Sequence, residues 1–361
     1  MSPQLLAGRV LTPAGMIGPA AVTIEGGLIT GVAPVADAPD VIVAPGFVDL
    51  QVNGMDDVDV ATAEDQGWDR LDALLLASGV TTWFPTLPTL APERYPDALA
   101  GIAAAAARLG RRPAIGGAHL EGPFLARAGA HPPEHLRAFD ADWLASLPPI
   151  VRLVTVAPEL VGAPAVIAAL VERDITVSVG HTDASAAEVR CAALAGATLA
   201  THLFNVMPPI SARAPGAAGA VLVDDRITAC VIADLAHVHP ELLALAFRAK
   251  PGRIALVTDA VAWRGVPSTA YDGVVPRRPD GTIAGSTLTL DRAVANVVRA
   301  AGVDVAEALR AASTVPAAAL GLHDRGTIAV GRRADLVVLG PALDVRQTWI
   351  AGQLAHGAPT A

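Results

Sequence analysis

Three stretches of the chain place a metal-binding side chain at the end of an apolar, strand-like run. Glu121 follows the run at 115–120 and precedes a glycine–proline turn. His181 follows the run at 176–180, and His202 ends a short stretch that begins at 199. One carboxylate and two imidazoles form the ligand set of a catalytic zinc ion, with one position left open for water. A lone histidine at a strand end is more often structural, so the prediction depends on the three residues meeting.

A fourth polar residue, Asp259, follows the fully apolar run at 254–258. A zinc ion lowers the pKa of its bound water towards about 7, and a nearby carboxylate must take the proton and return it to the leaving group. Asp259 suits that role because it is expected at the same edge as the metal ligands. The alternative is that Asp259 caps a following helix. His131 and His237 are candidates for orienting a substrate or stabilising an oxyanion.

A second cluster of residues has the chemistry of an anion site. Asn205 lies in the stretch 202–209, and Arg213 follows it, just before a proline–glycine loop. An amide, exposed backbone N–H groups and a guanidinium suit a phosphate. A solvated loop arginine explains Arg213 equally well, and the sequence alone leaves both interpretations open. The five other histidines are expected to be structural or on the surface: His119, His135, His239, His323 and His356.

An alternation of strand-like and helical patterns must position these residues. Helical patterns such as those at 65–77, 92–108, 164–172 and 184–195 separate apolar strand-like runs. This alternation predicts a parallel sheet, and eight such units predict a closed (β/α)₈ TIM-type barrel with its active site at the carboxyl ends of the strands. The eight runs lie at 47–52, 81–85, 115–120, 151–157, 176–180, 199–203, 227–233 and 254–258.

Both ends of the chain lack a helical period and read as short strands with turns. Strand-like runs lie at 6–11, 20–25, 28–32 and 41–44, and again at 336–339 before a final hairpin near 351–352. We therefore expect the two ends to pair into one small β-sandwich. The predicted domains are 1–44 and 321–361 for the two parts of the sandwich, and 45–320 for the barrel.

Composition excludes several classes of function. The chain has 361 residues, of which 52% are apolar, and a net charge of −9. Its longest apolar run has only about ten residues, half the length of a membrane span, and an acidic chain lacks the basic face that nucleic acid requires. Cys191 and Cys230 show no CxxC spacing, and the first residues lack the pattern of a signal peptide, so we expect a reduced, cytoplasmic setting. The single lysine, Lys250, is expected to lie on a solvated turn.

Taken together, these motifs resemble the amidohydrolase superfamily and, within it, the N-acetylglucosamine-6-phosphate deacetylases. The resemblance runs nearly end to end, and HLEGP and THLFNVMP are the motifs most specific to the deacetylases. The motifs are PGFVDLQVNG at 45–54, HLEGP at 119–123, Gly180-His181, THLFNVMP at 201–208, Asp234 with His237, LVTDA at 256–260, GTIAGS at 281–286 and GRRADL at 331–336.

The resemblance implies a role for each matching residue. Glu121, His181 and His202 would hold the metal, and Asp259 would be the acid and base. The loop Ile283-Ala284-Gly285 would close over the sugar, and the enzyme would be a homodimer with its phosphate site near the partner subunit. Contacts to the sugar phosphate would come from Ala130, His131, Asn205, Val206, Arg213 and His237.

Two absences favour one divalent metal ion per subunit. Many amidohydrolases carry His-x-His on the first strand, where this chain has Gln51 and Asn53, and neither amide is a good zinc ligand. Many others bridge two metals with a carboxylated lysine on the fourth strand, where this chain has none. Zn²⁺ fits the ligand set best, although Fe²⁺, Co²⁺ or Mn²⁺ could occupy the same ligands. Val206 and the segment Trp263-Arg264 depart from the family pattern and leave the sugar open.

The predicted reaction is hydrolysis of the acetamido group of an amino-sugar 6-phosphate, giving acetate and the free amine. The nearest alternatives are a deacetylase for the galactosamine epimer or for an unphosphorylated N-acetyl compound. A cyclic amidase would need the paired-metal ligands that are absent here. A non-catalytic sugar-binding barrel would not require Asp259 beside a full ligand set.

Overall fold

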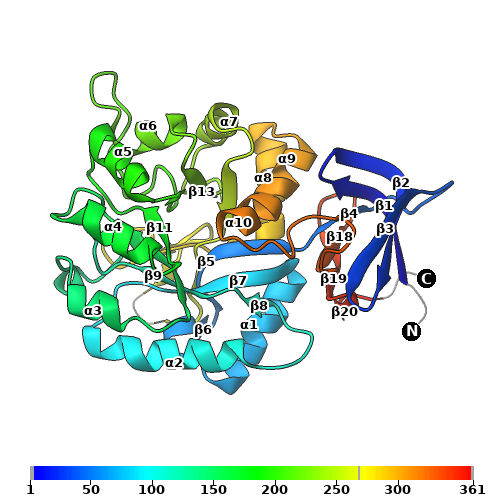
Figure 1. Cartoon of the computed structure of the whole chain (residues 1–361), viewed down its shortest axis with the longest axis horizontal. Helices are drawn as coiled ribbons and strands as arrows, with labels where there is room; N and C mark the ends of the chain where they lie inside the picture. The colour runs from blue at the N-terminus through cyan, green and yellow to red at the C-terminus, as the bar shows by residue number, and fades with distance from the viewer. Residues whose placement is uncertain (1–3, 267–268, 359–361) are drawn as a thin grey trace.

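Strands from both ends of the chain form one mixed sheet in the computed structural model, which describes residues 4–266 and 269–358. The seven strands are hydrogen-bonded in the order β20-β19-β18-β4-β1-β2-β3, at the right of Figure 1. The two ends meet where β18 pairs antiparallel with β4. The strands are β1 (Gln4–Thr12), β2 (Gly15–Glu25), β3 (Leu28–Pro34), β4 (Ile42–Pro45), β18 (Leu336–Leu339), β19 (Val345–Ile350) and β20 (Gln353–His356).

The middle of the chain forms a second sheet whose main path is parallel throughout. Each of the eight predicted runs contributes a strand to it, so the predicted α/β class is confirmed. The strand after β14, β15 (Ala260–Ala262), pairs in parallel with the first strand, β5. Two short strands lie off this path: β6 (Val58–Asp59) pairs with β5, and β8 (Ala114–Ile115) pairs with β7. The eight strands are β5 (Phe47–Asp56), β7 (Val80–Leu87), β9 (Ala118–Glu121), β10 (Val151–Val156), β11 (Thr176–Val179), β12 (Leu199–Ala200), β13 (Thr228–Ile232) and β14 (Ile254–Val257).

Two predicted strands are interrupted or shortened for local reasons. The run at 115–120 divides at Gly116-Gly117, where a Cβ on Gly116 would lie 2.6 Å from the Phe84 ring and a Cβ on Gly117 2.4 Å from the Arg152 side chain. The run at 199–203 is a strand only to Ala200, because His202 adopts a positive φ of 28° and the backbone turns there.

Helices surround the parallel sheet in Figure 1. The predicted helix at 65–77 is confirmed, whereas the one at 92–108 begins as a 3-10 turn. The helix expected from 184 begins at Ala186, because Ser185 caps it and Glu188 completes a capping box. The helices are α1 (Asp65–Ala77), α2 (Tyr95–Ala106), α3 (Ala141–Ser146), α4 (Ala163–Val171), α5 (Ala186–Ala195), α6 (Gly216–Val223), α7 (Pro240–Ala249), α8 (Leu290–Ala301), α9 (Val305–Ala312) and α10 (Thr314–Ala319), with 3-10 turns η1 (Val60–Thr62), η2 (Pro92–Arg94) and η3 (Pro133–His135).

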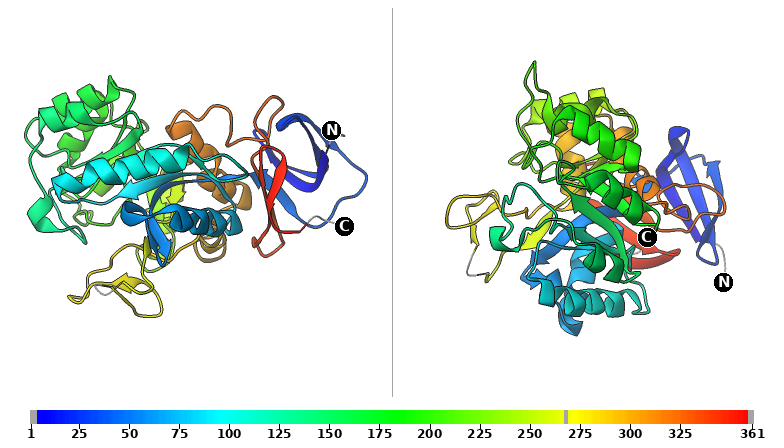
Figure 2. Two further views of the ribbon diagram at one scale, coloured as in Figure 1. Left: turned by 90° about the horizontal axis from the view of Figure 1, so that it is seen from below. Right: turned by 60° about the vertical axis from the view of Figure 1, so that its left-hand side comes forward.

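A small hairpin projects from the body of the protein after β15. Its strands, β16 (Ala270–Tyr271) and β17 (Pro276–Arg277), pair antiparallel, and Figure 2 shows this yellow segment standing away from the sheet. The chain then returns along β15, where Ala260 bridges Ser286. The hairpin is therefore attached close to Asp259.

Neighbouring side chains of β4 divide between the two hydrophobic cores. Ile42 and Ala44 pack in the core of the parallel sheet, and Val43 packs in the core of the terminal sheet. Val337 and Val338 of β18 divide in the same way. Because successive side chains of a strand point to opposite faces, β4 and β18 join the two cores.

Two further expectations can be compared with the described residues. Lys250 is buried at 2% exposure, with Nζ donating to the Asp224 carbonyl at 2.8 Å, so the predicted solvated turn lysine is wrong. The turn itself is present, but the lysine side chain folds back onto the protein. Among helices of the described ranges, none is both long and apolar enough to cross a membrane.

Candidate active site

The predicted site residues meet at one edge of the parallel sheet. Glu121 ends β9, while His181, His202 and Asp259 each come two positions after the end of β11, β12 and β14. The latter three have positive φ values of 50°, 28° and 49°. A left-handed conformation is uncommon for residues with a Cβ and is frequent at functional sites. Here it turns the chain sharply as each strand ends.

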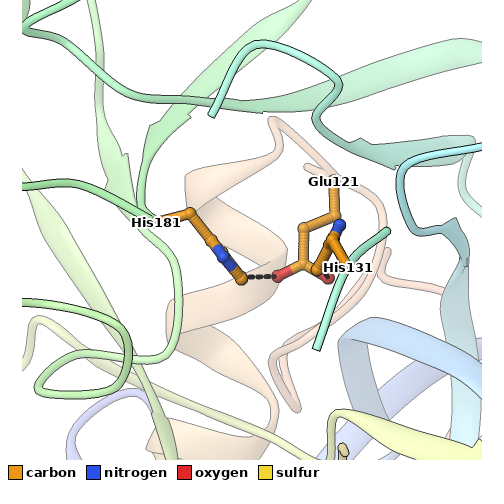
Figure 3. Close-up of side chains that lie close together, drawn as sticks. All are labelled: Glu121, His131 and His181. Carbon is orange, nitrogen blue, oxygen red and sulfur yellow. Dashed lines mark hydrogen bonds and ion pairs between the residues drawn. The ribbon is translucent and has the colours of Figure 1, made fainter. Parts of the chain in front are cut away.

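The predicted metal ligands converge on one oxygen. Glu121 Oε1 lies 2.9 Å from His202 Nε2 and 3.2 Å from His181 Nε2, and the two nitrogens are 3.1 Å apart. All three side chains are buried. His131 also reaches this cluster, with Nε2 3.4 Å from Glu121 Oε2. Figure 3 shows His131 and His181 approaching the carboxylate of Glu121 from different sides.

Hydrogen bonds to the far nitrogens distinguish the histidines. His181 Nδ1 lies 2.9 Å from the Arg127 carbonyl, which can only accept, so in the neutral ring Nε2 presents a lone pair to Glu121. His131 Nδ1 accepts from the Thr89 backbone N–H at 3.0 Å, so its Nε2 carries the hydrogen. His181 is thus arranged as a metal ligand and His131 as a hydrogen-bond donor. A ring nitrogen of each nevertheless lies within 4.8 Å of a carboxylate oxygen of Glu121.

This arrangement fits a bound cation. The Nε2 lone pair of His181 faces a carboxylate oxygen at 3.2 Å, a contact between two acceptors that a divalent ion between them would make favourable. Burial by itself raises the pKa of Glu121, but hydrogen bonding to neighbouring imidazoles, that of His131 first, holds that pKa well below its usual range. Glu121 is therefore an anion at neutral pH, as a ligand must be.

Asp259 lies beside this cluster and is held by two amides. Its Oδ1 accepts from Asn53 Nδ2 at 2.8 Å and from Gln51 Nε2 at 3.0 Å, and Gln51 Nε2 also donates to Glu121 Oε1 at 2.9 Å. Burial, and then the charge of Glu121, raises the pKa of Asp259 to about 8. The alternative of a helix cap is wrong, because β15 follows Asp259.

These groups open into one cavity of about 460 Å³. It is lined by all of the predicted site residues except Arg213. Those lining residues are Glu121, Ala130, His131, His181, His202, Asn205, Val206, His237, Asp259, Ile283, Ala284 and Gly285. His237 is fixed by Asp234, whose Oδ2 lies 2.6 Å from Nδ1.

Arg213 is the one predicted site residue that the structure does not bring to the cavity. It is exposed on the loop before α6 and is absent from the cavity wall of this chain. The five histidines set aside in the sequence also stay away from the cavity. One of them, His119, is fully internal, with Nε2 2.8 Å from Thr155 Oγ1, and burial lowers its pKa to about 4.

Sequence reasoning missed several residues that line or support the cavity. Thr89 and the Arg127 carbonyl fix the two histidine rings, and no local motif marks either of them. Arg278 and Thr282 line the cavity from the segment after β17. Thr282 belongs to the motif at 281–286 and Arg278 lies three positions before it, which was the available signal. Gln51 and Asn53 were noted only as missing ligands, and their hydrogen bonds to Asp259 require the folded sheet.

The chain is similar to known proteins over most of its length. The model of the amidohydrolase family matches residues 42–355. The chain is 40% identical over 350 residues to the human N-acetylglucosamine-6-phosphate deacetylase, covering 89% of this chain and 85% of that protein. It is 36% identical to the N-acetylgalactosamine-6-phosphate deacetylase of Escherichia coli O157:H7, covering 98% of this chain and all of that protein.

Two solved structures are similar over nearly the whole chain. The N-acetylglucosamine-6-phosphate deacetylase of Thermotoga maritima matches with a TM-score of 0.91 at 30% identity, covering 98% of this chain and 100% of that one. A variant of the Mycobacterium smegmatis enzyme in complex with N-acetyl-D-glucosamine-6-phosphate matches with a TM-score of 0.89 at 36% identity, covering 98% and 99%. The chain therefore belongs to the amidohydrolase family and, within it, to the N-acetylglucosamine-6-phosphate deacetylases.

Proposed function

We propose that the protein hydrolyses the N-acetyl group of N-acetyl-D-glucosamine 6-phosphate, giving D-glucosamine 6-phosphate and acetate. The observation that carries the proposal is the meeting of Glu121, His181 and His202 beside Asp259 in a buried cavity. The relatives, at about 36–40% identity over most of the chain, act on this class of substrate. The cavity, at about 460 Å³, has room for a sugar next to the reacting groups.

One divalent cation held by Glu121, His181 and His202 would supply Lewis acidity, which acidifies water and polarises a carbonyl. Nitrogen and carboxylate donors suit Zn²⁺, and Fe²⁺, Co²⁺ or Mn²⁺ accept the same set. A single ion is favoured because the amides of Gln51 and Asn53 already donate to Asp259. The fourth strand of the parallel sheet, β10, has no lysine that could bridge a second ion.

The remaining chemistry falls to the side chains of this chain. Asp259 takes a proton from the attacking water and gives it to the departing nitrogen, and a pKa raised towards neutrality suits both transfers. His131, with its Nε2–H directed to the cavity, donates to the acetyl oxygen as negative charge develops there. Acetate and a free amine result.

Substrate binding is assigned to the walls of the cavity. Ala130, Asn205, Val206 and His237 would contact the sugar phosphate. Ile283, Ala284 and Gly285 would cover the sugar, since they line the cavity, and the first two pair with the hairpin strand β17. Trp263 and Arg264 lie at the base of that hairpin, so we expect them to influence the access of substrate to the cavity.

The resemblance also suggests a homodimer with the phosphate site near the partner subunit, and we propose that Arg213 contacts the phosphate there. The exposed position of Arg213, outside the cavity of its own chain, is consistent with that arrangement. Two large apolar side chains near these residues in the sequence are exposed: Ile210, three positions before Arg213, and Leu235, two positions before His237.

We further propose that the parallel sheet closes into a (β/α)₈ barrel. The parallel pairing of β15 with β5 supports closure, as does the Asp259 N–H, which donates to the Gln51 carbonyl at 2.9 Å. The barrel would span 45–320, with a small β-sandwich built from 1–44 and 321–361. The pairing of β18 with β4 supports this division.

An acetate-release assay on purified protein tests the proposed function. The substrates are the N-acetylated glucosamine and galactosamine sugars, each with and without the 6-phosphate, and bound metal is measured in the same preparation. We expect the glucosamine 6-phosphate derivative to have the highest kcat/KM and one ion per chain. Preference for the galactosamine 6-phosphate derivative would favour the second candidate, which the Escherichia coli relative supports. No release from either phosphorylated sugar would refute both.

A further inference from the structure

The segment that follows the projecting hairpin contributes a cation to the wall of the cavity. Among the described residues that line the cavity, Arg278 is the single arginine or lysine. The same wall contains three carboxylates, those of Asp59, Glu121 and Asp259. A substrate that carries a phosphate needs a compensating positive charge in such an acidic cavity, and Arg278 is the side chain of this subunit that can provide it.

The turn that follows β17 fixes the direction of Arg278. Its backbone N–H donates to the Thr282 carbonyl at 2.9 Å, and its carbonyl accepts from the Gly281 N–H at 2.9 Å. Arg278 thus begins a tight turn, and Thr282, which pairs with it, also lines the cavity. These two backbone hydrogen bonds hold the backbone of Arg278 in the turn, which reduces the ordering needed on binding.

The neighbouring arginine points elsewhere and is already paired. Arg277 Nε lies 2.6 Å from Asp272 Oδ2, and Arg277 Nη1 donates to the Gly281 carbonyl at 3.0 Å. Arg277 is not among the residues that line the cavity, whereas Arg278 is. The half-buried Arg278 takes part in none of the ion pairs found in the described ranges, and its guanidinium remains available for a ligand.

The distance along the chain matches a substrate with two different ends. Ser286 hydrogen-bonds to the Asp259 backbone, with its N–H 2.8 Å from that carbonyl. From Ser286 four residues lead back to Thr282, and they span at most about 14 Å. Asp259 and Arg278 both line the cavity, so one small substrate can reach both. An N-acetylated sugar with a 6-phosphate has its acetamide and its anion at opposite sides of the ring.

We infer that Arg278 binds the anionic group of the substrate, the 6-phosphate, from within the same subunit. This inference rests on the proposed function and adds to it a residue that decides between phosphorylated and unphosphorylated sugars. A guanidinium offers a planar pair of donors to phosphate oxygens. The contact does not depend on Arg213, which lies outside the cavity of this chain.

Steady-state kinetics of Arg278→Ala and Arg278→Lys test the inference, with Arg277→Ala as the matched control. For the phosphorylated sugar we expect Arg278→Ala to raise KM about 10- to 100-fold with kcat changed less than about threefold, since a charge-assisted hydrogen bond is lost. The Lys variant should recover part of the affinity. For the unphosphorylated sugar the Ala variant should match wild type, and Arg277→Ala should match wild type on both substrates.

Equal losses on both sugars would overturn the inference, because Arg278 would then contact the ring or support the hairpin. No change on the phosphorylated sugar would overturn it as well. A second measurement separates a failure of the inference from a failure of the proposed function. Calorimetry gives the affinities of wild type and Arg278→Ala for glucosamine 6-phosphate and for glucosamine. If wild type releases no acetate but Arg278→Ala weakens only glucosamine 6-phosphate, the inference survives and the reaction does not. Unchanged affinity for glucosamine 6-phosphate overturns the inference whatever the activity.

Discussion

At the scale of single residues, this site depends on which hydrogen-bond partner each polar atom has. His131 and His181 have the same side chain but different partners. The Thr89 N–H binds Nδ1 of His131, so its Nε2 carries a hydrogen, whereas the Arg127 carbonyl binds Nδ1 of His181, so its Nε2 keeps a lone pair. Asp259 likewise differs from Glu121 in what surrounds it. Imidazoles hold the pKa of Glu121 low, while burial raises that of Asp259 to about 8. The two carboxylates are therefore suited to different tasks, one as a ligand and one as a proton carrier.

Asn53→Ala should shift the pH dependence of activity. The Asn53 amide donates to Asp259 Oδ1 at 2.8 Å and lowers the pKa of Asp259. Removal of the amide raises that pKa. Because a general base acts only when deprotonated, activity should be lost at a higher pH than in wild type as the pH is lowered. We expect the rising limb of the kcat/KM profile to move upward by about one pH unit, from the loss of a bond to a charged group.

The control for this variant is its metal content, because Asn53 touches none of the predicted ligands. Metal bound per chain should equal that of wild type. A pH profile that coincides with wild type at full metal occupancy would contradict the role assigned to Asn53.

At the scale of elements, strand ends place the reacting groups, and residues of the segment 282–286 line the same cavity. Gly285 lies where this segment runs alongside β15, with a positive φ of 65°. A Cβ there would lie 2.3 Å from Val261 Cγ1 and 2.8 Å from the Asp259 carbonyl oxygen. The glycine is thus required by close approach as well as by conformation.

Gly285→Ala should displace the segment from Asp259 and lower kcat/KM by at least about tenfold, since small misplacement of a catalytic group is costly. Gly281→Ala is the matched control: its φ is 85°, similarly left-handed, but a Cβ there meets no atom within 4 Å. In thermal melts Gly281→Ala should lose only a small amount of stability, from its backbone conformation, and Gly285→Ala should lose more because its Cβ also meets Val261 and the Asp259 carbonyl. Equal kcat/KM in the two variants would show that the contact with Asp259 is unimportant.

At the scale of the whole molecule, β4 and β18 tie the terminal sheet to the parallel sheet. Leu339 belongs to a terminal strand but is fully buried in the core of the parallel sheet. Leu336, three positions earlier, is buried in the core of the terminal sheet instead. Two cores that share strands in this way should unfold together.

Leu339→Ala and Leu336→Ala should each destabilise the protein by ~2–5 kcal/mol, the usual cost of a buried leucine truncation. In both variants, unfolding in denaturant should remain one transition, with near-ultraviolet and far-ultraviolet circular dichroism coincident. Two separated transitions in either variant would mean that the terminal sheet folds independently.

Much of the site could be predicted from the sequence because its chemistry is written in local patterns. Apolar runs ending in Glu121, His181, His202 and Asp259 identify strands by period and length, and parallel strands bring their carboxyl ends to one edge. The β-rich ends of the chain were also recognisable from their turns. In each case the signal lies within a few residues.

Only the tertiary structure decided which atoms face one another. The partners of His131 and His181, the amides on Asp259 and the orientation of Arg278 come from segments far apart in sequence, and burial of Lys250 reverses what its turn suggests. Hydrogen-bond direction and burial are properties of packing, which a local pattern does not contain. The sequence by itself therefore determined the reacting groups and their strands, and packing determined their protonation, their orientation and the cation that faces the cavity.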